Sequence, residues 1–129
     1  DVSGVRVLLK ALKRGEAIGV LPDQVPGSGD GEWAEFFQRP AYTMTIWSRL
    51  AEKSGATVLL MATKRLSRGA GFELFFRAIP PQLEGETRSR QLNRGLEILI
   101  KENPSQFLWS YNRYKNPSNE NRQKTAITQ

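Results

Sequence analysis

A carboxylate and a carboxamide stand together where an apolar run ends. Asp23 and Gln24 follow the run 17–21 and Pro22. In an open α/β sheet, ligands bind beyond the carboxyl ends of the strands. Asp23 could accept a hydrogen bond from a hydroxyl group or orient an arginine, and Gln24 could both donate and accept. The alternative is that Asp23 only nucleates the following turn, and spacing alone favours that alternative.

A second group of candidates mixes aromatic rings with cations. The stretch "PSQFLWSYNRYK" (104–115) places Arg113 and Lys115 among aromatic residues. Such a mixture could stack on RNA bases, or place Trp and Tyr at a lipid headgroup layer with the cations near phosphates. Alternatively, residues 107–109 close a core while both cations stay in water.

Aromatic residues also follow the glycine-rich loop, where Trp33, Phe36 and Phe37 precede Arg39. Exposed, they would form an apolar patch for a lipid or a protein partner. Buried, they would be ordinary core, which is the interpretation we favour for the two phenylalanines. Trp33 remains open between the two.

Two motifs that suggest phosphate binding favour simpler interpretations. The loop "GSGDG" (27–31) lacks the Lys-Ser/Thr ending of a phosphate-binding P-loop and does not lead straight into a helix. The stretch "EGETRS" (84–89) could bind an anion through Arg88 at a helix N-terminus. We favour an acidic first turn that suits the helix dipole.

Composition excludes several kinds of chemistry. The 129 residues include no histidine and no cysteine, so the chain has no imidazole base, no histidine-ligated metal and no thiolate nucleophile. The net charge of +6 favours an anionic partner: nucleic acid, an acidic protein or anionic lipid. No apolar run approaches the ~20 residues of a membrane span. Because the chain opens inside an apparent element, we expect it to be a fragment.

The periodicity of apolar residues predicts helices alternating with strands. An amphipathic helix is expected around Val5–Leu12, ended by Gly15 in the left-handed conformation. The remaining elements are expected as a strand at 17–21, a loop at 23–33, a helix at 42–54, strands at 56–63 and 71–79, and a helix at 86–102. This order predicts an α/β fold with a mainly parallel sheet. Three strands make a thin sheet, so further strands are expected upstream of residue 1.

Three stretches together resemble the C-terminal half of the lipid A biosynthesis (lauroyl/myristoyl) acyltransferases, within the wider glycerolipid acyltransferase-like group. They are "LKALKRGEAIGVLPDQ", "FFQRPAYTMT" and "PSQFLWSYNRYK". The chain departs from the family pattern at Gln38, where glycine is common, and at Val25, where an acidic residue is common. The matching residues are Leu12, Gly15, Asp23 and Gln24; Phe36, Phe37, Pro40, Ala41 and Thr43; and Pro104, Gln106, Leu108, Trp109, Arg113 and Lys115.

The resemblance implies a partial three-layer α/β acyltransferase domain over residues 1–115, and the polar tail at 116–129 is expected to be disordered. It implies transfer of an acyl chain from acyl carrier protein to a hydroxyl of a lipid A precursor, without a cofactor or metal. It also implies a full-length protein on the cytoplasmic face of the inner membrane, while the fragment itself is expected to be soluble.

The family's catalytic motif is His-x4-Asp/Glu, whose histidine deprotonates the acceptor hydroxyl. This chain has no histidine, so no catalytic residue is expected here and the fragment alone should be inactive. The expected substrate-binding residues are Asp23, Gln24, Arg39, Trp109 and Arg113. Two alternatives remain: a basic nucleic-acid-binding module, and a scaffold piece with an exposed apolar sheet edge.

Overall fold

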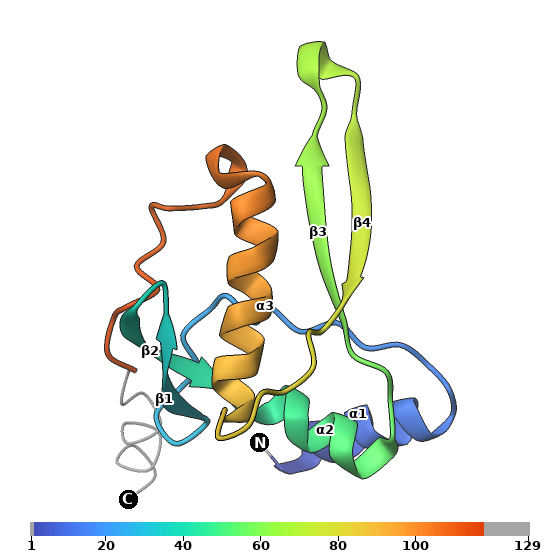
Figure 1. The fold of residues 1–129 in the computed structure, drawn as a ribbon. Helices are drawn as coiled ribbons and strands as arrows, with labels where there is room; N and C mark the ends of the chain where they lie inside the picture. Colours follow the sequence, from blue (N-terminus) through green and yellow to red (C-terminus); the bar gives the residue numbers. More distant parts are fainter. Residues whose placement is uncertain (1, 118–129) are drawn as a thin grey trace, which may run out of the picture.

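The computed structural model describes residues 2–117, which form three helices and two β-hairpins (Figure 1). The longest helix, α3, stands between the two hairpins, and α1 and α2 lie side by side below them. The elements are α1 (Val2–Lys13), β1 (Gly31–Phe36), β2 (Arg39–Met44), α2 (Ile46–Ser54), β3 (Leu59–Arg65), β4 (Phe72–Ala78) and α3 (Arg88–Glu102), with short 3-10 turns at Ser67–Gly69 and Pro104–Gln106.

The predicted helices at either end of the chain are confirmed. In α1, the predicted apolar stripe is half-buried, whereas Val7 on another face is exposed. Gly15 adopts a positive φ of 77°, as expected for a glycine that ends a helix. In α3, Thr87 caps the first turn by accepting a hydrogen bond from the Arg90 amide at 3.2 Å.

The sequence did not predict the first hairpin. β1 and β2 pair antiparallel from Gly31↔Met44 to Phe36↔Arg39, where a loop and the first turn of a helix were expected. As a result, α2 begins at Ile46 rather than at residue 42, although it ends before Gly55 as predicted. The two turn residues, Phe37 and Gln38, have φ of 46° and 61°. Hairpin turns of this kind normally use Asn-Gly or Asp-Gly, so the usual sequence signal was missing.

The predicted parallel sheet is not present in residues 2–117. β4 lies within the predicted strand 71–79 and β3 overlaps the predicted strand 56–63, beginning and ending later, but the two pair antiparallel, from Leu59↔Ala78 to Arg65↔Phe72. A connection as short as 66–71 permits only an antiparallel pair. The segment 17–21, predicted as a covered strand, forms no strand, and Val20 and Leu21 are exposed. The fold is therefore mixed α and β with two small antiparallel sheets, and no three-layer arrangement is seen in the part of the chain described.

The core lies where α3 packs against both hairpins. Phe36 and Ala41 from the first hairpin and Leu60 from the second meet the apolar side of α3, with Trp47 from α2 completing the cluster. The expectation that the two phenylalanines belong to the core holds for Phe36, which is 1% exposed. The predicted polar tail lies outside the described residues from 118 onward.

Gly95 lets α3 approach the base of the second hairpin closely. A Cβ at this position would lie 2.6 Å from Leu60 Cδ1 and 3.0 Å from Pro80 Cδ. We expect Gly95→Ala to lower the free energy of unfolding by about 1–3 kcal/mol, because overpacking outweighs the gain in helix propensity of about 1 kcal/mol. Urea denaturation checks this.

The matched control is Gly4→Ala in α1, where an added Cβ meets no atom within 4 Å. That variant should be at least as stable as the unmodified protein, since only helix propensity changes. Equal effects of the two substitutions would contradict the close approach at Gly95.

Candidate substrate-binding site

The three sequence motifs that are far apart in the chain meet at the first hairpin. The turn after Asp23 is attached to the C-terminal segment, because the Val25 amide donates to the Tyr111 hydroxyl at 2.9 Å. The C-terminal segment is attached to the hairpin, because the Tyr114 hydroxyl donates to the Phe36 carbonyl at 3.0 Å. Residues 23–25, 36–43 and 107–115 therefore form one cluster, which we call the motif cluster.

Arg113 is the buried centre of the motif cluster. Its side chain is 3% exposed and donates to the Tyr42 carbonyl at 2.7 Å and to the Thr43 hydroxyl at 2.8 Å. Its Nε has no hydrogen-bond partner among the described residues. Burial lowers the pKa of the Arg113 guanidinium, while Tyr111 and the Asp23 carboxylate act in the opposite direction. A buried cation held by neutral groups fixes the C-terminal segment to β2.

Asn93, which belongs to none of the sequence motifs, joins α3 to the same network. Its side-chain amide donates to the Thr43 hydroxyl at 2.9 Å and to the Glu35 carbonyl at 3.0 Å. Asn93 is fully buried, although it lies on the helix face that carries Leu92 and Leu96. A polar residue within an apolar helical stripe was the signal that could have revealed it, because buried amides are retained where they are hydrogen-bonded.

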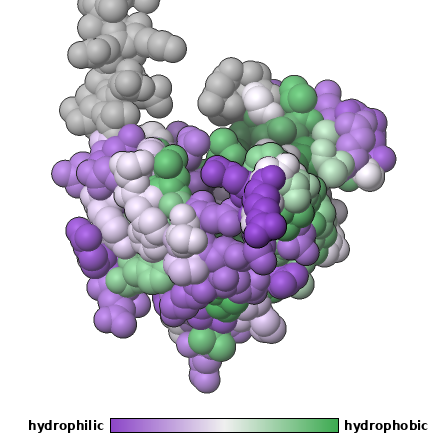
Figure 2. Space-filling view, turned by 90° about the horizontal axis from the view of Figure 1, so that it is seen from above, coloured by the Kyte–Doolittle hydropathy of each residue, from purple (hydrophilic) through white to green (hydrophobic). Residues whose placement is uncertain are grey.

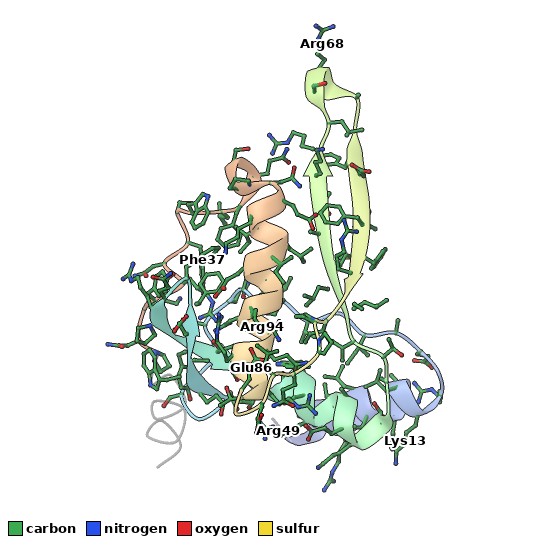
Figure 3. The ribbon with its side chains drawn as sticks, viewed as in Figure 1. Lys13, Phe37, Arg49, Arg68, Glu86 and Arg94 are labelled. Carbon is green, nitrogen blue, oxygen red and sulfur yellow. The ribbon has the colours of Figure 1, made fainter. Side chains whose placement is uncertain are left out.

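An aromatic group lies beside this network, at the turn of the first hairpin. The rings of Phe37 and Trp109 are 5.9 Å apart, and Phe107 lies 4.9 Å from Trp109. The Arg39 guanidinium stacks 4.0 Å from the centre of the Tyr114 ring. Figure 3 labels Phe37, which points from the hairpin toward the C-terminal segment.

The five predicted substrate-binding residues thus lie in or beside one cluster, in different environments. Asp23 is half-buried and Gln24 is exposed, while Arg39 and Trp109 are exposed. Arg113 is the exception, because its side chain is enclosed and its terminal nitrogens bind the protein itself. The arrangement leaves a carboxylate, an amide, a cation and an aromatic ring available at the surface.

The strain in the hairpin turn leads to a stability prediction. A non-glycine residue in the left-handed region costs roughly 1–2 kcal/mol, and Gln38 is exposed with φ of 61°. We expect Gln38→Gly to raise the free energy of unfolding by about 0.5–1 kcal/mol after the entropy of glycine is subtracted. Thermal unfolding checks this, with Gln38→Ala as the control that should bring no gain.

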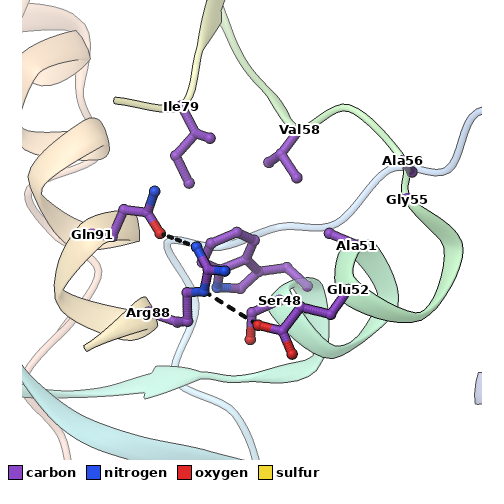
Figure 4. Close-up of a pocket in the computed structure, with 10 residues that line it drawn as sticks. Ser48, Ala51, Glu52, Gly55, Ala56, Val58, Ile79, Arg88 and Gln91 are labelled. Atoms are coloured by element: carbon purple, nitrogen blue, oxygen red, sulfur yellow. Dashed lines mark hydrogen bonds and ion pairs between the residues drawn. The ribbon is translucent and has the colours of Figure 1, made fainter. Parts of the chain in front are cut away.

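The motif "EGETRS" uses its charges within the protein. Glu86 accepts from Arg94 at 2.8 and 2.9 Å; both residues are labelled in Figure 3. Arg88 is bound by Glu52 at 3.2 Å and by Gln91 at 3.1 Å (Figure 4). Glu86 lies before the helix cap rather than in its first turn, so the favoured structural interpretation holds in a modified form.

The Glu86–Arg94 pair makes stability dependent on pH. The hydrogen bond from Arg94 holds the pKa of Glu86 below its usual value. A depressed pKa contributes stability above the unfolded value of about 4.3, and this contribution is lost as the pH falls through the folded value. Between about pH 6 and pH 3, the free energy of unfolding should therefore fall more in the unmodified protein than in Glu86→Gln. Urea denaturation at each pH measures this difference. Glu16→Gln, at an exposed ion pair, should leave the acid response unchanged.

A cavity of about 250 Å³ lies next to Arg88, between α2, the start of α3 and the base of the second hairpin (Figure 4). Trp47, Val58 and Ile79 supply its apolar lining. The Trp47 indole nitrogen has no hydrogen-bond partner among the described residues. The cavity is separate from the motif cluster.

Within residues 2–117, no group of three potential ligands is placed to hold a metal ion, and none of the helices is long and apolar enough to cross a membrane. Comparison with known proteins defines the class. The chain matches the profile of the bacterial lipid A biosynthesis acyltransferases over residues 1–116. It therefore belongs to this family.

Individual relatives agree with this assignment. The chain is 29% identical to the lipid A biosynthesis lauroyltransferase of Escherichia coli (strain K12), over 89% of this chain and 39% of the relative. It is 32% identical to the palmitoleoyltransferase of the same organism, over 88% of this chain and 38% of the relative. A Shigella flexneri lipid A biosynthesis acyltransferase matches equally well. The chain thus spans about two fifths of the length of these relatives.

Proposed function

We propose that this chain supplies substrate-binding walls and a docking surface to an acyltransferase that acts on a lipid A precursor. The observation that carries the proposal is that the end of the first family-like motif, at Asp23 and Gln24, lies in one cluster with the second and third motifs. The hydrogen bond from the Val25 amide to the Tyr111 hydroxyl joins positions 86 residues apart.

The proposed reaction moves an acyl chain from the thioester of acyl carrier protein to a hydroxyl of the lipid A precursor. The hydroxyl oxygen attacks the thioester carbonyl carbon, the carbon–sulfur bond breaks, and the carrier leaves as a thiol. A hydroxyl is a poor nucleophile until a base takes its proton. Because this sequence has no histidine, the base is proposed to lie in the part of the family-length protein outside these residues.

Within this proposal Asp23 and Gln24 face the substrate, and Arg39 and Trp109 border it. Arg113 acts through the others, since it holds β2 and the C-terminal segment in register. Exposed cations on α1 and at the tip of the second hairpin would attract an acidic carrier protein and a phosphorylated acceptor. These cations are Arg6, Lys10, Lys13, Arg65 and Arg68. The proposed location is the cytoplasmic face of the inner membrane.

An acyl-transfer assay tests the proposal. The family-length protein, given acyl-acyl carrier protein and a lipid A precursor, should form the acylated lipid, and the 129-residue chain should form none. Transfer by the histidine-free chain would refute the assignment of the base. Absence of transfer by the family-length protein, with tight and salt-sensitive binding of single-stranded RNA, would instead support a nucleic-acid-binding module.

A further inference from the structure

One face of the second hairpin is apolar and uncovered. Leu59, Met61, Phe72, Leu74 and Phe76 lie on the same side of β3 and β4, which we call the outer face. Each of these side chains is between 52% and 70% exposed. The hairpin projects from the rest of the molecule, and from above, hydrophobic residues gather beside its hydrophilic tip (Figures 1 and 2). Contiguous exposed apolar surface of this kind marks an interaction site.

The opposite face of the hairpin is covered in part, since Glu73 and Arg77 on that face are exposed. Leu60 is 6% exposed and packs in the core with α3, and Phe75 is packed against that core. β4 alternates, with Phe72, Leu74 and Phe76 on the outer face and the charged residues Glu73 and Arg77 on the opposite face. Such alternation is typical of a strand whose apolar side packs against another layer. The sequence of β4 therefore suits a layer beyond the outer face.

The two edges of the hairpin differ in their free backbone groups. The Leu66 amide donates to the Gly71 carbonyl and the Ile79 amide to the Val58 carbonyl, which shows which residue pairs of the ladder are hydrogen-bonded. Because hydrogen-bonded and non-hydrogen-bonded pairs alternate, the amides of Phe72, Leu74 and Phe76 point away from β3. On the other edge, the Gln106 side chain accepts from the Arg65 amide at 2.7 Å and donates to the Arg65 carbonyl at 3.1 Å. Gln106 thus occupies the end of the β3 edge, while the outward amides of β4 have no bonded partner among the described residues.

We propose that the outer face and the β4 edge form the docking surface for the part of the family-length protein outside this chain. That part would add a strand along β4 and cover the outer face with apolar side chains. The chain spans only 38–39% of its relatives, so a family-length protein has the material to do so. The exposed apolar residues Val20 and Leu21 form a second surface for the same occupant.

Two other occupants fit the surface less well. A lipid layer would leave the β4 amides without hydrogen-bond partners in hydrocarbon, at a cost of several kcal/mol for each group. A second copy of the chain could pair along β4, but that pairing would not by itself cover the exposed apolar segment 17–21. This proposal rests on the proposed function only in assuming that the chain works as part of a protein of the full family length. Its test does not depend on acyl transfer.

Hydrogen exchange in the family-length protein provides the test. The outward amides of Phe72, Leu74 and Phe76 should be as strongly protected as the ladder amides of the same hairpin. Exchange of these amides at the rate of an open edge would overturn the proposal. Protection that disappears when a dimer is diluted to monomer, or that requires added anionic vesicles, would assign the surface to a second copy or to lipid and would also overturn it.

A matched pair of substitutions gives a second readout in the same protein. Leu74→Ser should lower the midpoint of thermal unfolding, because Leu74 is buried in the assembled protein. Leu83→Ser replaces a similarly exposed leucine in the loop before α3, and should leave the midpoint unchanged. Equal midpoints for both variants would contradict the proposed contact, whether or not either variant transfers acyl chains.

Discussion

Replacement of Arg113 by alanine is expected to lower the free energy of unfolding by about 2–4 kcal/mol. The change removes two short hydrogen bonds and leaves the Tyr42 carbonyl and the Thr43 hydroxyl buried without that donor. The loss is limited because this buried cation, which donates no hydrogen bond to a carboxylate among residues 2–117, also carries a desolvation cost that disappears with it. Chemical denaturation, monitored by circular dichroism, measures the result.

Two further variants separate hydrogen bonding from packing. Arg113→Met keeps much of the side-chain volume and should still be destabilised, because the polar groups of β2 remain unsatisfied. Arg49→Ala removes an exposed arginine whose side chain, among residues 2–117, bonds only the Thr45 hydroxyl, and should cost less than about 0.5 kcal/mol. If Arg113→Met were as stable as the unmodified protein, the hydrogen bonds of Arg113 would make no net contribution to the free energy of unfolding.

Replacement of Asp23 by alanine in the family-length protein is expected to reduce acyl transfer about 100-fold, the effect typical of removing one oriented polar group from an active site. Asp23 is half-buried beside Arg113 and the tether from Val25 to Tyr111. The turn itself should persist, because that tether uses a backbone amide. Steady-state kinetics and thermal unfolding of the same preparation distinguish loss of turnover from loss of structure.

Asp30→Ala is the matched control for this experiment, since Asp30 is an exposed carboxylate in the same loop region. It should keep its activity within a few-fold of the unmodified enzyme. Unchanged turnover in Asp23→Ala would mean that Asp23 serves only the turn, as its spacing alone suggested. Equal losses in both variants would point to the loop as a whole rather than to one carboxylate.

The helices could be predicted because their signals are local. The apolar stripe around Val5–Leu12 and the glycines 15 and 55 determine where α1 and α2 end without help from distant residues. The first hairpin could not be predicted in this way. Its turn uses Phe37 and Gln38 in strained conformations that only the surrounding contacts maintain, including the bond from the Phe37 amide to Glu97 at 2.9 Å.

The sheet shows a different kind of failure. The apolar runs 17–21 and 56–63 were interpreted as strands covered on both faces, and 71–79 as a strand that alternates at first. The last two segments contribute most of β3 and all of β4. The structure pairs these two strands only with each other, and the run 17–21 with nothing. A composition suited to burial predicts that a strand is covered, but it does not say whether the covering residues lie within the same 129 positions.

For the candidate site, the resemblance named the expected substrate-binding residues, and their role stays a prediction. The structure places these residues in or beside one cluster: Asp23, Gln24, Arg39, Trp109 and Arg113. Nothing in the sequence distinguishes the enclosed Arg113 from the exposed Arg39, because burial depends on Thr43 and Asn93, which lie 50 residues apart in the chain. The contribution of Asn93 becomes visible only once α3 packs on the first hairpin.

The two hydrogen bonds between the Gln106 side chain and the Arg65 backbone also affect solubility. A carboxamide presents one donor and one acceptor in nearly the geometry of a peptide group, so Gln106 imitates a neighbouring strand for one residue and then stops. A sheet edge finished in this way resists the strand-by-strand growth that leads to aggregation. Loss of this one amide would give the β3 edge a free end at which other chains could stack.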